Sequence, residues 1–241
     1  MLNDLLTVTR KELLEIVMPE GRFRGGAKNV LILAGIAGLL FPLQAGPRWL
    51  TSWLSIYSAC FPAILLLNYA ADTFAGERER HTLETLLASR LPDAAILLGK
   101  VFAIVGFGWA LILLSQVLAV VGLTVVYGQG RLLFFDPAIA LSLVVIAAVL
   151  PLMLTTAGVL LSMTAPTVRS AGQRMLMPFL VIYGLPSVVP FLIGRFGWTP
   201  NVAGISPASI VAAVAVGGTV LSAILLAVAV RRFERERLVL S

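Results

Sequence analysis

The sequence predicts an all-α integral membrane protein with six transmembrane helices. Hydrophobic residues make up 59% of its 241 residues and charged residues only 12%, whereas a soluble domain carries roughly a quarter charged residues. Asp, Glu, Lys and Arg are absent from six stretches of the chain. Each stretch can hold the roughly 20 apolar residues that a spanning helix needs. The bilayer is therefore the solvent of most of this chain.

The six charge-free stretches define the predicted spans. They cover residues 29–47, 49–71, 101–130, 137–168, 175–194 and 196–230. Within them we predict spans near 29–44, 50–71, 101–125, 138–163, 175–193 and 208–230. Pro42 and Gln44 shorten the first span. Three prolines in the fifth predict a break after Leu185 and a re-entrant segment before the sixth span, because irregular backbone at that depth is tolerated only where protein or water covers it.

The basic residues predict the orientation. With the N-terminus in the cytoplasm, the inner segments 1–28, 72–100, 164–174 and 231–241 hold 15 Lys and Arg residues, and the outer loops hold three. This bias is the positive-inside pattern of membrane proteins. It places both termini and the 72–100 stretch in the cytoplasm. The net charge of +6 therefore indicates membrane edges rather than a nucleic-acid partner.

The first 28 residues predict an element outside the spanning core. Leucine, isoleucine and valine side chains share one side of a helix over residues 2–18, with Arg10, Lys11, Glu12 and Glu15 elsewhere. A helix with charges in its middle cannot span but can lie in the interface; a solubilising tail is the alternative. Residues 21–28 predict a flexible basic joint. We expect a single transmembrane domain over 1–241, with a core at 29–230 and a cytoplasmic tail at 231–241.

The residue inventory predicts a subunit without catalytic chemistry. The one histidine, His81, lies in the 72–100 stretch, and no carboxylate lies in any predicted span. Hydrolytic and metal sites therefore lack their reagents, and we expect no metal or cofactor in this chain. Gly99 and Lys100 are followed by valine, so no Walker A motif occurs there. Energy for transport would have to come from a partner.

The densest polar segment lies between the second and third predicted spans. It reads DTFAGERERHTLETLLASRLPDAAILLGK from Asp72 to Lys100. Residues 77–80 alternate in charge, and 82–88 have the leucine spacing of a short amphipathic helix. Thr82 is a candidate N-cap, and Pro92 marks the end of the helix. The segment can receive a soluble partner; a solvated loop whose leucines rest on lipid is the alternative.

The run FAGERERHTLETLLAS, followed by LLGK, resembles the permease subunits of ABC transporters of the second exporter class. Residues 72–100 carry the resemblance, with looser support from Arg10-Lys11-Glu12-Leu13 and the six-span layout. His81 stands where that family commonly has glycine, and the proline of Arg90-Leu91-Pro92 comes later than usual. These departures bear on where the short helix starts and ends.

The resemblance implies an ATP-driven exporter of the bacterial or archaeal inner membrane. Two permease chains, identical or related, pair, and each binds one ATP-binding-cassette subunit that holds ATP and Mg. The N-terminal helix lies along the inner leaflet, and the segment after the second span is a coupling helix that docks in the ATPase. A re-entrant segment follows the fifth span. The translocation path lies at the dimer interface, largely between the second and fifth spans.

Two groups of site residues follow. The resemblance implies a polar hinge and a docking helix made of Glu77, Arg78, Glu79, Arg80, His81, Thr82, Leu83, Glu84, Leu86 and Leu87. Polar residues in apolar spans are candidates for the path, namely Asn68, Tyr69, Gln116, Thr155 and Tyr183. The alternative for this second group is hydrogen bonding between helices. The lack of charge inside the spans favours an apolar or amphipathic substrate.

Two other functions stay open on the sequence. A membrane scaffold or assembly factor would use the 72–100 stretch to dock a cytoplasmic protein. An ion-coupled secondary carrier would use the proline-broken fifth span. Dependence on an ATPase separates the permease from both alternatives, and dependence on an ion gradient identifies the carrier.

Overall fold

The fold is built from helices that run along one long axis. The computed structural model describes residues 2–17, 23–52, 54–82, 92–180 and 207–233, and every regular element among them is helical. The elements are α1 (Leu2–Val17), α2 (Phe23–Gly35), the π-helix η2 (Ile36–Leu40), α3 (Phe41–Ala45), the 3-10 helix η3 (Gly46–Thr51), α4 (Leu54–Glu79), α6 (Asp93–Tyr127), α7 (Pro137–Thr164), α8 (Val168–Phe179) and α10 (Pro207–Arg232).

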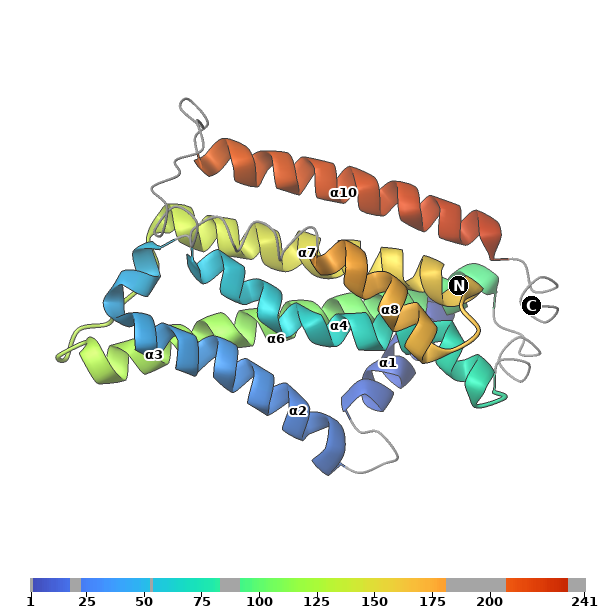
Figure 1. Cartoon of the computed structure of the whole chain (residues 1–241), viewed down its shortest axis with the longest axis horizontal. Helices are drawn as coiled ribbons and strands as arrows, with labels where there is room; N and C mark the ends of the chain where they lie inside the picture. The colour runs from blue at the N-terminus through green and yellow to red at the C-terminus, as the bar shows by residue number, and fades with distance from the viewer. Residues whose placement is uncertain (1, 18–22, 53, 83–91, 181–206, 234–241) are drawn as a thin grey trace.

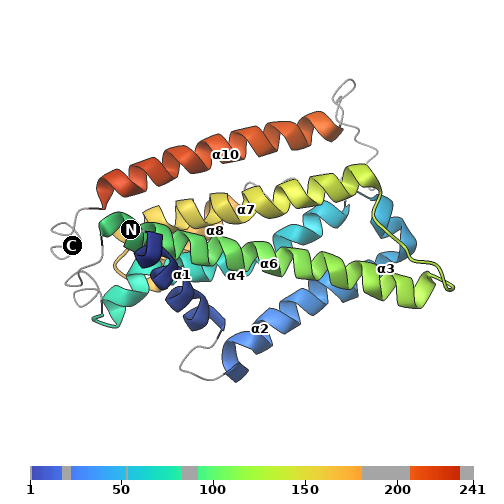
Figure 2. The ribbon, with the colours of Figure 1, turned by 180° about the vertical axis from the view of Figure 1, so that it is seen from behind.

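Helix α7 lies at the centre of the packing, against both α4 and α10. Helix α6 packs against α4 and α7 and also carries α1 and η2. Figures 1 and 2 show that the ends of α4, α7 and α10 and the starts of α6 and α8 gather at one end of the bundle, where α1 lies across α6. The charged last turn of α4 therefore lies at the same end of the bundle as the starts of α6 and α8.

Among the described residues, four helical segments are long and apolar enough to cross a membrane. They are Val30–Thr51, Asp93–Tyr127, Pro137–Thr164 and Val211–Arg232, and they coincide with the predicted first, third, fourth and sixth spans. Helix α4, the predicted second span, is not one of the four, although its 26 residues reach about 39 Å at 1.5 Å per residue. Of the predicted fifth span, only residues 175–180 are described, and they continue α8. The count of six spans stays a prediction.

The boundaries of three predicted spans differ from the structure. Helix α4 begins four residues after the start of the predicted second span and ends eight residues after its end. Helix α6 begins at Asp93, eight residues before the predicted third span. Pro92 precedes it in an extended conformation, and its carbonyl accepts from Ala95 and Ile96. Once this first turn forms, each further residue adds a hydrogen bond. The helix thus extends from the loop into the span without a break.

The first span also starts earlier and ends later than predicted. Residues 23–28, expected in a flexible joint, are helical, because a helix propagates more easily than it nucleates and a glycine costs it only about 1 kcal/mol. Pro42 does not end the helical run. It follows the π turn of η2, in which Phe41 N–H donates to the Ile36 carbonyl, and such a turn accommodates a residue that cannot donate.

Helix α1 buries part of the predicted apolar face and a charged residue beside it. Of the residues predicted on that face, Ile16 is buried and Leu13 packs against the same core, whereas Leu6 is exposed. Val8 is buried as well, and Glu12, predicted off that face, lies between Val8 and Ile16 at i, i+4 spacing. The apolar pattern does not reveal that α1 also packs on protein through a charge.

Candidate functional site

The charged run at the end of α4 contacts several elements of the bundle. Residues 77–79 form the last turn of α4, and Arg80 and His81 follow it. The sequence predicted a polar hinge here. In the structure, the side chains of Glu77, Arg78 and Glu79 each bind a different helix of the bundle, while Arg80 binds back to α4.

Lys100 is the centre of the contact made by Glu77. Its side chain, only 2% exposed, lies in the second turn of α6, and its ammonium donates to Oε1 of Glu77 at 2.8 Å and to Oε1 of Glu12 at 2.9 Å. The ammonium also lies 5.7 Å from the ring centroid of Phe74, within cation–π range. A buried charge must be paired, and Lys100 is paired with carboxylates from α1 and α4. The Oε2 atom of Glu77 has no hydrogen-bond partner within the described part of the chain.

Gly99 lets α1 approach α6 beside this cluster. A Cβ atom at Gly99 would lie 2.6 Å from Cγ1 of Val8, closer than real Cβ contacts occur. Glycine removes that clash, and Val8 fills the space. Gly99 and Lys100 together are therefore the attachment point of α1, one by close packing and the other by charge.

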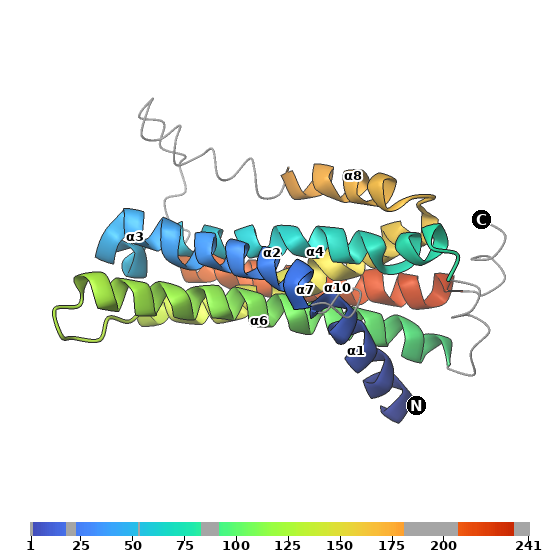
Figure 3. The same ribbon diagram turned by 90° about the horizontal axis from the view of Figure 1, so that it is seen from below.

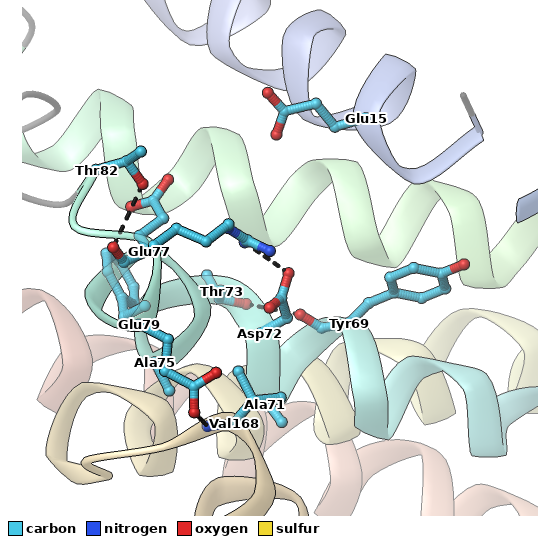
Figure 4. Close-up of polar contacts among 12 residues, drawn as sticks. Glu15, Tyr69, Ala71, Asp72, Thr73, Ala75, Glu77, Glu79, Thr82 and Val168 are labelled. Carbon is cyan, nitrogen blue, oxygen red and sulfur yellow. Dashed lines mark hydrogen bonds and ion pairs between the residues drawn. The ribbon is translucent and has the colours of Figure 1, made fainter. Parts of the chain in front are cut away.

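Arg78 and Glu79 bind the two helix termini next to α4. The guanidinium of Arg78 donates to the carbonyls of Met163 and Ala165 at the end of α7. Oε1 of Glu79 accepts from the backbone N–H of Val168, the first residue of α8, at 2.9 Å, as Figure 4 shows. A cation at a helix C-terminus and an anion at a helix N-terminus both oppose the macrodipole favourably. The α7–α8 corner is thereby held to the last turn of α4.

Arg80 folds back along its own helix. Its Nη2 atom lies 2.9 Å from Oδ2 of Asp72, and both side chains are partly exposed. The hydrogen bond to Asp72 holds the pKa of Arg80 above its ordinary value. Gly76 lies beneath the pair, because a Cβ atom there would meet the Asp72 carboxylate and lie 2.8 Å from Nη2 of Arg80. An exposed ion pair adds little stability, so this contact mainly sets the course of the Arg80 side chain.

His81 ends α4 in the left-handed conformation, with φ of 56°. The N–H of His81 donates to the Arg78 carbonyl, and the N–H of Thr82 donates to the Glu77 carbonyl. This pair of bonds is the Schellman C-cap, whose left-handed position glycine usually fills. The glycine that the family commonly has at this position thus corresponds to the left-handed backbone conformation of His81. Thr82, expected to cap the following helix, directs its hydroxyl to the Glu77 carbonyl at 3.3 Å.

Ser162 joins α7 to α4 just inside the charged end. Its hydroxyl donates to the carbonyl of Ala71 at 2.8 Å and accepts from the N–H groups of Phe74 and Ala75. All of these atoms are buried. The charged run therefore directly follows a part of α4 that is hydrogen-bonded to α7.

The predicted path residues are spread over several helices. On α4, Asn68 is exposed and Tyr69 packs edge-on against Phe107, with ring centroids 5.4 Å apart. Gln116 on α6 and Thr155 on α7 are buried, and among the described residues Gln116 Oε1 and the Thr155 hydroxyl have no hydrogen-bond partner. Tyr183 lies outside the described residues. Among the described residues, no hydrogen bond or ring contact joins two members of this group.

The sequence matches the family described as "ABC-2 family transporter protein" over residues 28–200, which is most of the chain. The chain belongs to the ABC-2 transporter family. No curated protein matches it. The match confirms the resemblance, and it identifies a multi-pass membrane permease of an ABC transporter. Permeases of this family are generally non-catalytic and pair with an ATP-binding-cassette subunit.

In an ABC-2 permease, the end of α4 is the point at which a cytoplasmic partner is expected. The structure describes the predicted coupling residues as far as Thr82, and Leu83, Glu84, Leu86 and Leu87 lie outside the described residues. Among the described residues, no cluster of three or more His, Cys, Asp or Glu side chains is placed to hold a metal.

Sequence reasoning missed the partners of the charged run. The sequence interprets Lys100 only as part of a motif, and it places Glu12 off the apolar side of the N-terminal helix. One signal was available: between Asp93 and Arg131, Lys100 is the single charged residue, and it has apolar neighbours on both sides. A lysine in such surroundings is almost never fully buried unless it is paired. The identity of its partners required the packing of α1.

Proposed function

We propose that this ABC-2 permease is the membrane-spanning subunit of an ATP-driven exporter whose energy comes from a separate ATPase. The observation that carries the proposal is the set of contacts between the end of α4 and the neighbouring helices. Glu77, Arg78 and Glu79 tie that end to α6, α7 and α8. A force applied just after it therefore acts on the bundle as a whole rather than on a loop.

The ATPase docks on residues 82–88 in this proposal. The leucines at 83, 86 and 87 share one side of a short helix by their spacing, and they fill an apolar groove of the partner. Charged groups around them give register and rim contacts rather than most of the affinity. Because α4 ends at Glu79 and α6 begins at Asp93, the docking segment sits between two helices of the bundle.

The complete transporter contains two permease chains and two ATPase subunits. Each ATPase holds ATP and Mg, and its closure moves the docking segment. The spans, six in each chain with both termini in the cytoplasm of a bacterial or archaeal cell, then switch between inward- and outward-facing packings as rigid bodies. A re-entrant segment near residues 186–190 covers the outer side. This arrangement assigns the charged end of the bundle in Figure 1 to the cytoplasm.

The substrate is apolar or amphipathic in this proposal. Within the predicted spans, neutral polar residues and no charges are available to line a path. Asn68 is exposed on α4, on a surface that a second chain can cover. The buried, unpartnered oxygens of Gln116 and Thr155 are the other candidates, together with Tyr69 and Tyr183.

Co-purification with the ATPase subunit tests the proposal. The tagged chain is expressed with its ATPase, extracted, and assayed for ATP hydrolysis in lipid. The variant Leu83→Asp/Leu87→Asp is expected to lose the partner, because burying two carboxylates in an apolar groove is strongly unfavourable. The matched control is Leu132→Asp/Phe134→Asp, which changes two exposed apolar residues at the opposite end. If both variants retain the ATPase, residues 82–88 are not the docking element; if the wild type binds none, the permease is not driven this way.

A further inference from the structure

Lys100 connects α1 to the last turn of α4. Its ammonium lies between Glu12 of α1 and Glu77 of α4, at 2.9 Å and 2.8 Å. Helix α1 also contacts α2, the start of the first predicted span. A chain of contacts therefore runs from the last turn of α4, through Lys100, to α1 and on to α2.

The burial of the cluster fixes the position of α1 relative to α6. The Lys100 side chain is 2% exposed, and those of Glu77 and Glu12 are 10% and 15% exposed. In such a setting a charge without its partner is strongly disfavoured, so each carboxylate has one acceptable position relative to the ammonium. Apolar packing alone allows helices to slide, whereas the ion pairs and the Val8–Gly99 contact fix α1 along α6.

We propose that Lys100 is a positioning residue that joins α1 to the last turn of α4, so that nucleotide-driven movement of the docking segment also moves α1. The inference rests on the proposed function and goes further by naming the connection to the N-terminal helix. Glu12 is the residue through which α1 follows the movement of Lys100. Figure 3 shows α1 extending away from the bundle on the α6 side, where a movement of its attachment point changes its direction.

Hydrogen exchange in the assembled transporter tests the inference. The chain with its ATPase in lipid nanodiscs is compared without nucleotide and with ATP trapped by vanadate. In the wild type, nucleotide is expected to change exchange both at residues 75–82 and in α1. In Glu12→Gln the change is expected to persist at 75–82 and to vanish from α1, whose basal exchange rises about tenfold because its local opening becomes easier.

A neighbouring substitution on the same helix provides the control. Glu15→Gln makes the identical chemical change at a side chain that is 60% exposed and paired only with Lys11 among the described residues, and it should respond like the wild type. Lys100→Arg should keep transmission and Lys100→Met should lose it. If Lys100→Met does not fold, Glu12→Gln still decides.

Two results would contradict the inference without contradicting the proposed function. One is a wild-type complex that responds to nucleotide at 75–82 and not in α1; the other is Glu12→Gln transmitting the change to α1 as the wild type does. A wild-type complex without any nucleotide response at 75–82 contradicts the proposed function instead, and the inference falls with it. If Glu12 only stabilised the attachment of α1, Glu12→Gln would raise the basal exchange of α1 without removing its response to nucleotide.

Discussion

The ammonium of Lys100 lies 2.8 Å from Oε1 of Glu77, 23 residues away in the sequence, and this contact holds the start of α6 to the end of α4. The same ammonium binds Glu12. The segment between these two helices is the one proposed to bind the ATPase. Its two attachment points are therefore fixed to each other and to the N-terminal helix by one buried lysine.

Removing Lys100 should destabilise the protein more than replacing the whole cluster. Lys100→Met leaves Glu77 buried without a cation among the described residues and leaves Glu12 only the exposed Lys11, at 3.6 Å, and breaking a buried ion pair in this way costs about 3–5 kcal/mol. Glu12→Leu/Glu77→Leu/Lys100→Met removes all three charges and should regain most of that loss. Thermal unfolding in a mild detergent measures both variants. Equal losses in the two variants would show that packing, not unpaired charge, sets the cost.

Gly99 and Gly106 should respond in opposite ways to alanine. A Cβ atom at Gly99 would clash with Val8, whereas a Cβ atom at Gly106, on the same helix, meets nothing within 4 Å. Gly99→Ala should therefore cost about 1–3 kcal/mol through overpacking, and Gly106→Ala should add up to about 1 kcal/mol through helix propensity. The midpoint of thermal unfolding reports both. Val8→Ala in the Gly99→Ala background should restore stability; no rescue would mean that α1 does not pack on Gly99.

His81 should tolerate glycine better than valine. Its φ of 56° costs a residue with a Cβ atom about 1–2 kcal/mol, and a β-branched side chain is the least suited to it. His81→Gly is expected to be neutral or slightly stabilising, and His81→Val destabilising by at least about 1 kcal/mol. Gln129, at φ of 46° in the loop at the other end, offers the matched pair Gln129→Gly and Gln129→Val. A stable His81→Val protein that still binds ATPase would argue against the C-cap.

Ser162→Ala should loosen the α4–α7 contact. The hydroxyl of Ser162 is buried and bonded to three backbone groups of α4, so its loss should cost about 1 kcal/mol. Thr164→Ala, which removes an exposed hydroxyl bonded within α7, serves as the control and should have little effect. Hydrogen exchange at Phe74 and Ala75 gives the local readout. Unchanged exchange there would contradict the assigned contacts.

The sequence predicted the helices whose bounds are set by the length of an uncharged apolar stretch. Helices α7 and α10 begin and end within two residues of their predicted spans, because the bilayer requires long uncharged helices. The start of α6 and the helical residues 23–28 were missed, since a helix extends into polar sequence once it is nucleated. The functional role of the charged run after Gly76 stays a prediction.

The partners of that run were beyond sequence reasoning for a physical reason. Glu12, Met163 and Val168 are each more than 60 residues from the side chains that bind them. Only the parallel packing of α4 on α7 and the crossing of α1 over α6 bring these groups together (Figures 1 and 2). Alternating charge alone also fits a solvated hinge.

Site-specific photo-crosslinking tests the central claim most directly. A photoreactive amino acid is placed at position 87, in the proposed docking helix, and at position 132, in the exposed loop at the opposite end, in cells that express the ATPase subunit. The account predicts that position 87 forms an adduct with the ATPase and that position 132 forms none. An adduct from position 132, or none from position 87 in a properly inserted chain, would contradict it.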